Sequence, residues 1–153
     1  ISSALSHEGS IYVAANGNGL FRFDAATGER HWEIASPGDK YGHSSPVASG
    51  RRIVVGCLGD KGQVRCVDSR FGEEQWCCDT HGVIYDGSPA IDGDRVYIGS
   101  VPGLLNAIDL ASGKLLGQYR LNDGHFLATP VAEKGAVYAA SYGNVLRRLR
   151  FVG

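Results

Sequence analysis

Four imperfect copies of one unit make up the sequence, and this repetition constrains the fold more than any other feature. The unit is clearest from Gly93 to Gly117, which reads as a turn, a β-branched strand, a Gly/Pro turn, an apolar strand, an Asp-x-x-Ser-Gly turn and the start of another strand. Corresponding turns carry Asp24, Asp68 and Asp109, at intervals of 44 and 41 residues. Such a period accommodates four short strands with their turns and is typical of a repeat architecture.

The spacing of glycines and apolar residues predicts an all-β chain. The 22 glycines separate short apolar stretches along the 153 residues, and no window keeps apolar residues at helical spacing for more than two turns. The expected strands are apolar on both sides, as in 96–98 and 104–108, so each sheet needs cover on both faces. Four-stranded sheets stacked around an axis provide that cover, which predicts a β-propeller.

The repeats divide residues 1–153 into three complete four-stranded antiparallel blades and three strands of a fourth. We expect blade 1 at about 1–35, blade 2 at about 44–79, blade 3 at about 88–121 and the incomplete blade 4 at about 129–152. Such a half-propeller leaves an apolar sheet face open at each end, above the few hundred Å² that a monomer usually tolerates. We therefore expect a partner, either the remaining half of a larger propeller or a second copy of the chain, and we favour the reading that this chain is a C-terminal half.

Composition argues against several classes of partner. The chain has 15 Lys and Arg against 16 Asp and Glu, and a net charge of -1 gives no basic footprint for nucleic acid. No apolar run reaches the roughly 20 residues of a membrane-spanning helix. The nearest basic cluster is Arg147, Arg148 and Arg150 on the last expected strand. Charges there either discourage adventitious strand pairing or meet acidic groups on a strand donated by a partner.

A turn motif follows the third expected strand of each complete repeat. Its members are Asp24, Gly28 and Trp32 in the first repeat, Asp68, Gly72 and Trp76 in the second, and Asp109 and Gly113 in the third, which has no tryptophan. The aspartate can accept backbone N–H bonds while the glycine takes a left-handed conformation, so we expect a structural role for the motif. The indole can dock over the neighbouring sheet and bury roughly 150–250 Å².

This motif, together with the Ser-Pro or Thr-Pro pair that opens repeats two to four, resembles the pyrroloquinoline-quinone-type (quinoprotein-like) propeller repeat. That family includes quinoprotein alcohol dehydrogenases and the lipoprotein of the outer-membrane β-barrel assembly machine. The resemblance covers the whole chain and implies a periplasmic or secreted setting. Because most bearers of the repeat bind no quinone, we expect no cofactor; pyrroloquinoline quinone with calcium belongs only to the alternative of a dehydrogenase fragment.

Loops between blades line the central channel of a propeller, which is the usual ligand site of this architecture. When the repeats are aligned on their Ser/Thr-Pro pairs, His43 and Asp86 occupy the same position, where an apolar residue is natural. Buried polar groups need partners, which makes these two residues candidates for ligand binding. Together with Tyr41, Tyr85 and His125 they are the ligand-binding candidates. The other reading is that these are solvated loop residues.

The cysteines allow two readings each. Cys57 and Cys66 come close to facing each other across an expected hairpin, where opposed Cα atoms lie about 4.5–5.5 Å apart, near the span of a disulfide. Packing of small residues is the other reading for this pair. The adjacent Cys77 and Cys78 invite comparison with a disulfide that packs on the quinone in some dehydrogenases of the family, but an extended strand favours two ordinary strand residues.

The sequence holds no recognisable catalytic or metal-binding motif. No spacing of His, Cys, Asp and Glu resembles a zinc or calcium site, and there is no nucleophile elbow, phosphate loop or usable dinucleotide fingerprint. We therefore assign no catalytic residue and no metal ligand. The sequence favours a non-catalytic scaffold that binds a protein, peptide or small ligand at its channel or rim. The alternatives are a fragment of a quinone-dependent dehydrogenase and a sensor module of a larger enzyme.

Overall fold

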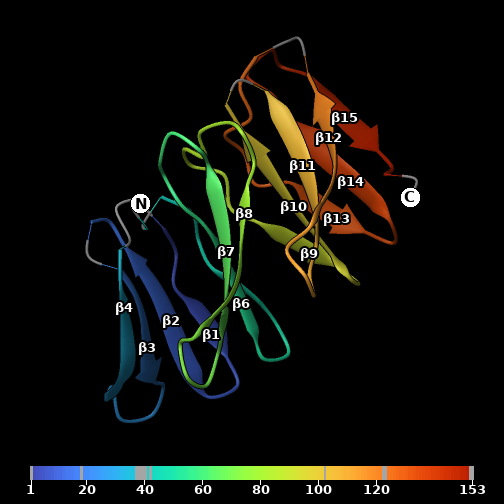
Figure 1. Ribbon diagram of the computed structural model, residues 1–153. Helices are drawn as coiled ribbons and strands as arrows, with labels where there is room; N and C mark the ends of the chain where they lie inside the picture. Colours follow the sequence, from blue (N-terminus) through green and yellow to red (C-terminus); the bar gives the residue numbers. More distant parts are fainter. Residues whose placement is uncertain are drawn as a thin grey trace.

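The computed structural model describes residues 2–17, 19–36, 41, 43–101, 103–121 and 124–151. Within these residues the chain forms four sheets, of four, four, four and three strands. Figure 1 shows the sheets side by side in chain order, from the N-terminal sheet to the C-terminal one. The predicted all-β half-propeller, with three complete blades and three strands of a fourth, is confirmed. The outer limits expected for blades 1 and 4, residues 1 and 152, lie outside the described residues.

Each sheet follows the chain from its first strand outward, and neighbouring strands are antiparallel. Blade 1 contains β1 (Leu5–His7), β2 (Ser10–Ala15), β3 (Gly19–Asp24) and β4 (Arg30–Ala35). Blade 2 contains β5 (Val47–Ser49), β6 (Arg52–Gly56), β7 (Gln63–Asp68) and β8 (Glu74–Asp79). Blade 3 contains β9 (Ala90–Asp92), β10 (Arg95–Ser100), β11 (Leu104–Asp109) and β12 (Leu115–Arg120). Blade 4 contains β13 (Val131–Glu133), β14 (Ala136–Ala140) and β15 (Leu146–Leu149).

The turn between β3 and β4 shows how the aspartate–glycine motif works. Oδ1 of Asp24 accepts hydrogen bonds from the backbone N–H groups of Ala26 and Thr27 at 2.9 and 2.8 Å. Gly28 donates its N–H to the Asp24 carbonyl and has a φ of 74°. These bonds hold the pKa of the Asp24 carboxyl below its ordinary value, because they favour the charged form. The turns at Asp68 and Asp109 repeat this arrangement, with Gly72 and Gly113 at a φ of 73°.

Three apolar cores lie between successive blades. Alternate residues of one strand enter different cores: Val54 of β6 belongs to the core between blades 2 and 3, whereas Ile53 and Val55 belong to the core between blades 1 and 2. The third core, between blades 3 and 4, includes Leu105 and Val137. The middle sheets are therefore covered on both faces, which is why their strands are apolar on both sides.

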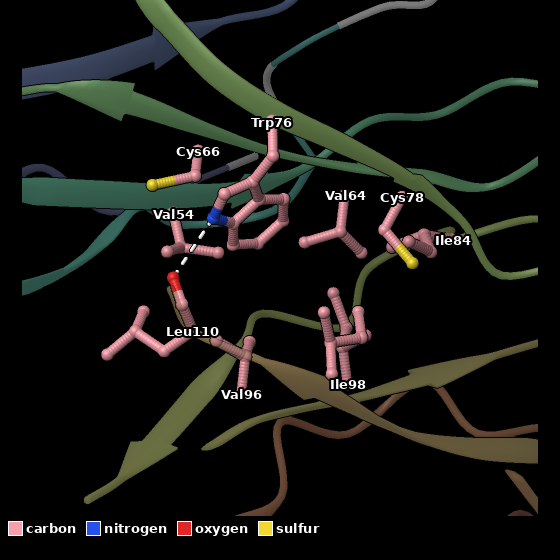
Figure 2. Close-up of a cluster of buried hydrophobic side chains, with 10 residues drawn as sticks. Val54, Val64, Cys66, Trp76, Cys78, Ile84, Val96, Ile98 and Leu110 are labelled. Carbon is pink, nitrogen blue, oxygen red and sulfur yellow. Dashed lines mark hydrogen bonds between the residues drawn. The ribbon is translucent and has the colours of Figure 1, made fainter. Parts of the chain in front are cut away.

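The two tryptophans join neighbouring blades. Trp76 of β8 is 7% exposed and donates its Nε1–H to the carbonyl of Leu110 in blade 3 at 3.0 Å, as Figure 2 shows. A Cβ on Gly113 would lie 2.6 Å from the indole, so only glycine leaves room for this contact. Trp32 makes the corresponding bond to the carbonyl of Ser69 in blade 2, at 3.1 Å. Each indole thus fastens the outer strand of one blade to the turn of the next.

Blade 3 has Gly117 in the place of the tryptophan and contacts blade 4 in another way. A Cβ on Gly117 would lie 3.4 Å from the ring of Phe151, which occupies this space. Phe151 also packs on Tyr97, with ring centroids 5.7 Å apart. Its carbonyl accepts a hydrogen bond from Nη1 of Arg95 at 2.7 Å. The Phe151 ring thus provides the packing, and the Arg95 guanidinium the hydrogen bond to a carbonyl of the next blade, that a single indole provides in blades 1 and 2.

The register of β6 and β7 contradicts a disulfide between Cys57 and Cys66. Cys66 lies opposite Val54, whereas the N–H of Cys57 bonds to the carbonyl of Gln63. Cys66 therefore belongs to the core between blades 2 and 3, and Cys57 to the core between blades 1 and 2, on the other face of the sheet. Of the two readings, the disulfide is wrong, and the packing of both cysteines as small core residues describes them correctly. Burial raises the pKa of the Cys66 thiol to about 12.

The adjacent Cys77 and Cys78 are successive residues of the outer strand β8. The strand pairs Cys77 with Arg65 and Cys78 with Val64. Cys78 is buried in the core between blades 2 and 3, and Cys77 is exposed. The two side chains therefore point to opposite faces, as expected for ordinary residues of an extended strand.

Candidate functional site

The candidate binding residues lie on loops that lead from the outer strand of one blade to the first strand of the next, and hydroxyl groups hold these loops in register. The N–H of Ser3 donates to Oγ of Ser45 at 2.8 Å. In the same way the N–H of Ser45 donates to Oγ of Ser88 at 2.8 Å, and the N–H of Ser88 to Oγ1 of Thr129 at 3.2 Å. We call these contacts the hydroxyl series. Through it, the residue before each proline ties its blade to the preceding blade.

One large side chain from each loop fills the space between two blades. Tyr41, Ile84 and Phe126 are each 1% exposed, and we call them the plug residues. They pack on very small residues of the second strand. A Cβ on Gly56 would lie 2.9 Å from the Ile84 side chain, and a Cβ on Gly99 would lie 2.5 Å from that of Phe126. Because the plug residues are buried, they hold in place the loop residues that follow them in the chain.

Three of the predicted residues, His43, Tyr85 and Asp86, come together on two successive loops. Nδ1 of His43 lies 3.1 Å from Oδ1 of Asp86. Because an ionised carboxylate only accepts hydrogen bonds, Nδ1 is the donor. The rings of His43 and Tyr85 have centroids 5.6 Å apart and are tilted by 56°. His43 and Asp86, which are one repeat apart in the sequence, are thus in direct contact between neighbouring loops.

Solvent reaches all three side chains of this cluster. Tyr85 is 47% exposed, and the side chains of His43 and Asp86 are 22% and 51% exposed. The carboxylate can accept hydrogen bonds from a ligand, while the face of the Tyr85 ring can lie against an aliphatic or cationic group. The cluster therefore suits a ligand that presents a hydrogen-bond donor or a positive charge beside an apolar segment.

Tyr41 does not belong to this cluster. It is 1% exposed and packs in the core between blades 1 and 2, with Ala14 and Cys57. Burial raises the pKa of its phenol well above the ordinary value, because the charged form would be poorly solvated. The interpretation of Tyr41 as a binding residue is therefore corrected: it anchors the loop that carries His43.

His125 also lies apart from the cluster. Its carbonyl accepts a hydrogen bond from the N–H of Tyr142 at 3.2 Å, as the carbonyl of Val83 does from that of Val101 at 2.7 Å. His125 is therefore the counterpart of Val83, and Phe126 is the plug of its loop. The loop into blade 4 has one residue fewer between its plug and its Thr-Pro pair, which shifted the sequence alignment by one position. His125 lines a separate pocket of about 270 Å³ together with Leu127, Ala128, Ala140, Ser141, Tyr142 and Asn144.

A basic pocket between blades 1 and 2 has no counterpart among the predicted sites. The guanidinium carbons of Arg51 and Arg70 lie 5.7 and 5.4 Å from the ring centroid of Phe71, which is 58% exposed. Arg22 lines the same pocket, of about 240 Å³, and donates to the carbonyl of Arg70 at 3.1 Å. Part of this charge is neutralised, since Arg51 pairs with Asp68 at 2.7 Å. Arg51, Arg70 and Phe71 come from two adjoining turns of blade 2, and the stacking of the blades adds Arg22 of blade 1. No single local motif therefore marks this pocket.

The described residues do not fit a calcium–quinone centre. In the described part of the chain, no group of three or more His, Cys, Asp and Glu side chains is placed to hold a metal ion. Calcium takes about six to eight oxygen ligands, commonly from several carboxylates. The recurrent aspartates are instead bonded to the N–H groups of their own turns. We therefore derive no chemistry through a quinone.

No helix among these residues is long and apolar enough to cross a membrane.

A family model described as outer membrane protein assembly factor BamB matches residues 2–150. The chain belongs to this family. BamB from Moranella endobia is 25% identical to this BamB-like chain, over 91% of this chain and 38% of the relative. The crystal structure of BamB from Moraxella catarrhalis matches with a TM-score of 0.76 at 21% identity, over 96% of this chain and 44% of that one. A quinohemoprotein alcohol dehydrogenase from Pseudomonas putida matches with a TM-score of 0.74 at 15% identity, over 90% and 28%.

These matches confirm the predicted membership of the pyrroloquinoline-quinone-type repeat family. The likeness to the dehydrogenase, at 15% identity, shows the fold alone. The BamB-like chain spans 38% and 44% of two of the BamB proteins it matches, so it corresponds to less than half of their length. The sequence match and the fold therefore both identify the chain as a BamB-like propeller repeat domain.

Proposed function

We propose that this BamB-like half-propeller is a non-catalytic scaffold that binds a polypeptide on the cluster formed by His43, Tyr85 and Asp86. The observation that carries the proposal is the 3.1 Å contact between His43 and Asp86, made by two neighbouring loops. Buried plug residues and the hydroxyl series fix both loops. A site held in place before its ligand arrives avoids part of the ordering cost of binding.

A segment that contains arginine or lysine fits the cluster best. The Asp86 carboxylate, 51% exposed, can accept hydrogen bonds from the cationic group. The Tyr85 ring, 47% exposed, can contact the aliphatic part of the same side chain or the charge itself. A cation over an aromatic face at an exposed site contributes about 0.5–1 kcal/mol. These contacts predict preference for basic peptides over acidic ones.

Further blades complete the scaffold in this proposal. The chain matches 38% and 44% of the length of two BamB proteins. We therefore favour the remaining half of a larger propeller as the partner, with a second copy of the chain as the alternative. The relatives are outer membrane protein assembly factors, which supports a protein-binding role and a periplasmic or secreted setting.

Selection of random dodecapeptides on the immobilised protein tests the binding proposal. We expect enrichment of peptides with Lys or Arg, and a loss of affinity of about tenfold or more for Asp86→Asn and for Tyr85→Ala, as for residues at the centre of an interface. Asp94→Asn, which changes an exposed carboxylate on the turn between β9 and β10, is the matched control and should bind like the wild type. Selected peptides that bind all three variants equally would contradict the proposed site.

The quinone alternative has a direct test of its own. The protein is mixed with pyrroloquinoline quinone and calcium chloride, and unbound quinone is removed by gel filtration. We expect the protein fraction to carry no quinone absorbance, because the described residues do not fit a calcium–quinone centre. Stoichiometric absorbance that elutes with the protein would refute the scaffold proposal in favour of a dehydrogenase fragment.

A further inference from the structure

The pocket beside His125 is the fourth member of a series in which the other three are filled. In blade 2, Oγ of Ser44 accepts the N–H of Gly56 at 3.0 Å, and the plug Ile84 lies on this pair. In blade 3, a Cβ on Gly87 would lie 3.3 Å from the carbonyl oxygen of Gly99, and the plug Phe126 lies on Gly99. Small residues thus form the floor on which each plug rests.

Blade 4 repeats the floor without a plug above it. Ala128 and Ala140 occupy the positions of the small floor residues, and both line the pocket of about 270 Å³. Oγ of Ser141 in this pocket is buried without a hydrogen-bond partner among the described residues. Tyr142 on the rim is 69% exposed. The pocket has room for one large side chain. Oγ of Ser141 remains available to bond to the segment that carries that side chain.

We propose that this pocket accepts the plug residue of a further blade, a Tyr, Phe or Ile on the loop that enters that blade. The three loops of this chain define the pattern of such a segment. Tyr41 and Ile84 precede the Ser of a Ser-Pro pair by four residues, and Phe126 precedes the Thr of a Thr-Pro pair by three. The expected occupant therefore reads as a large apolar residue followed, three or four residues later, by Ser-Pro or Thr-Pro.

The hydroxyl series specifies a second contact of the same segment. Ser88 donates its N–H to Oγ1 of Thr129 at 3.2 Å, and Thr129 stands at the end of the series in this chain. The N–H of Thr129 is therefore the donor for the hydroxyl of the incoming Ser-Pro or Thr-Pro pair. The plug and this hydroxyl together fix both the position and the direction of the loop.

The sheet beside the pocket favours a whole blade over a loose peptide as the natural occupant. Leu146 of β15 is 71% exposed, whereas its counterparts Leu20 and Leu105 are fully buried against the following blade. Val131 of β13 is 63% exposed on the same face. The inference rests on the part of the proposed function in which further blades complete the ring, and it adds the residues by which they are recognised.

A synthetic peptide of residues 82–91, which carries Ile84 ahead of Ser88-Pro89, is the probe for this site. It is titrated to millimolar concentration into the isotope-labelled full chain, and amide shifts are followed by NMR. We expect saturable shifts at Ala140, Ser141 and Tyr142. An Ile84→Gly peptide should bind about tenfold or more weakly, because it lacks the plug. Absence of saturable shifts, or equal binding of the glycine peptide, would overturn the proposal.

Filling the pocket from within the protein provides an independent test. Ala140→Phe should abolish the shifts caused by the peptide, whereas Ala111→Phe, in an exposed turn of blade 3, should leave them unchanged. Undiminished peptide binding by folded Ala140→Phe would also overturn the proposal, and the glycine peptide still tests it if this variant does not fold. Asp86→Asn should not alter these shifts, so failure of the proposed site at His43, Tyr85 and Asp86 can be distinguished from failure of the pocket.

Discussion

Replacement of Trp76 should be the most damaging single truncation between blades 2 and 3. The side chain is 7% exposed, packs over Gly113, and bonds to the carbonyl of Leu110 at 3.0 Å. Loss of a buried tryptophan costs about 3–5 kcal/mol, because the cavity is only partly refilled. Trp76→Phe keeps most of the ring contact but leaves the Leu110 carbonyl without its donor, which costs about 1–2 kcal/mol. We therefore expect Trp76→Ala to be the more destabilising of the two.

Urea unfolding of the full chain, followed by far-UV circular dichroism, measures these changes as shifts of the midpoint. Trp32→Ala is the matched control, because Trp32 makes the same kind of bond, to Ser69, but is only half-buried. It should cost about half as much as Trp76→Ala. The reasoning would be refuted if Trp76→Ala cost less than about 1 kcal/mol, or less than Trp32→Ala.

Three further predictions concern pH, thiols and the open face of blade 4. Burial alone would raise the pKa of Asp68, but the backbone N–H bonds in its turn and the ion pair with Arg51 together outweigh this and hold it below the ordinary value. Its stabilisation is therefore present above the unfolded pKa of about 3.9 and is lost as pH falls through the lower folded value, so Asp68→Asn should flatten the fall of the urea midpoint in acid. The exposed Cys77 should react with a thiol reagent before the buried Cys66, whose pKa is raised to about 12, and Cys77→Ser should remove the fast phase. Leu146→Glu should change the unfolding free energy by no more than about 0.5 kcal/mol, whereas Leu105→Glu, at 0% exposure, should prevent folding as judged by circular dichroism.

The repeat could be read from the sequence because its strongest signals are local. An aspartate that bonds to the next N–H groups, a glycine with positive φ and a tryptophan at fixed distance act within a few residues, as at Asp24, Gly28 and Trp32. Their recurrence gave the number of blades and of strands. Alignment also placed His43 and Asp86 at the same position, because both loops have the same number of residues before their Ser-Pro pair. Their direct contact at 3.1 Å is a finding of the structure.

The two errors, at the cysteines and at His125, have different causes. The second and third strands of blade 2 keep the register of blade 1, where Ala15 and Arg22, the counterparts of Cys57 and Cys66, lie opposite Gly19 and Tyr12 and not opposite each other. The disulfide reading therefore paired two positions that neither blade places opposite each other. The loop into blade 4 is one residue shorter after its plug, which made His125 look equivalent to Tyr41. At His125 the loss of one residue from the loop changes which space a side chain enters, and composition carries no record of it.

The open face of blade 4 carries side chains that serve as interface residues elsewhere in the same chain. Arg22 of blade 1 crosses to blade 2, where its Nη1 donates to a turn carbonyl at 3.1 Å. Arg148 occupies the same position of blade 4 and lies over the Tyr138 ring, with its Nε bonded to the Tyr138 hydroxyl at 3.1 Å. Tyr138 is 37% exposed, whereas its counterpart Tyr12 is 2% exposed. A surface that faces only solvent has no need of apolar residues, an aromatic ring and a guanidinium at the positions that make contacts between blades elsewhere in the chain. Their presence on β14 and β15 is the strongest structural reason to expect that another blade covers this face.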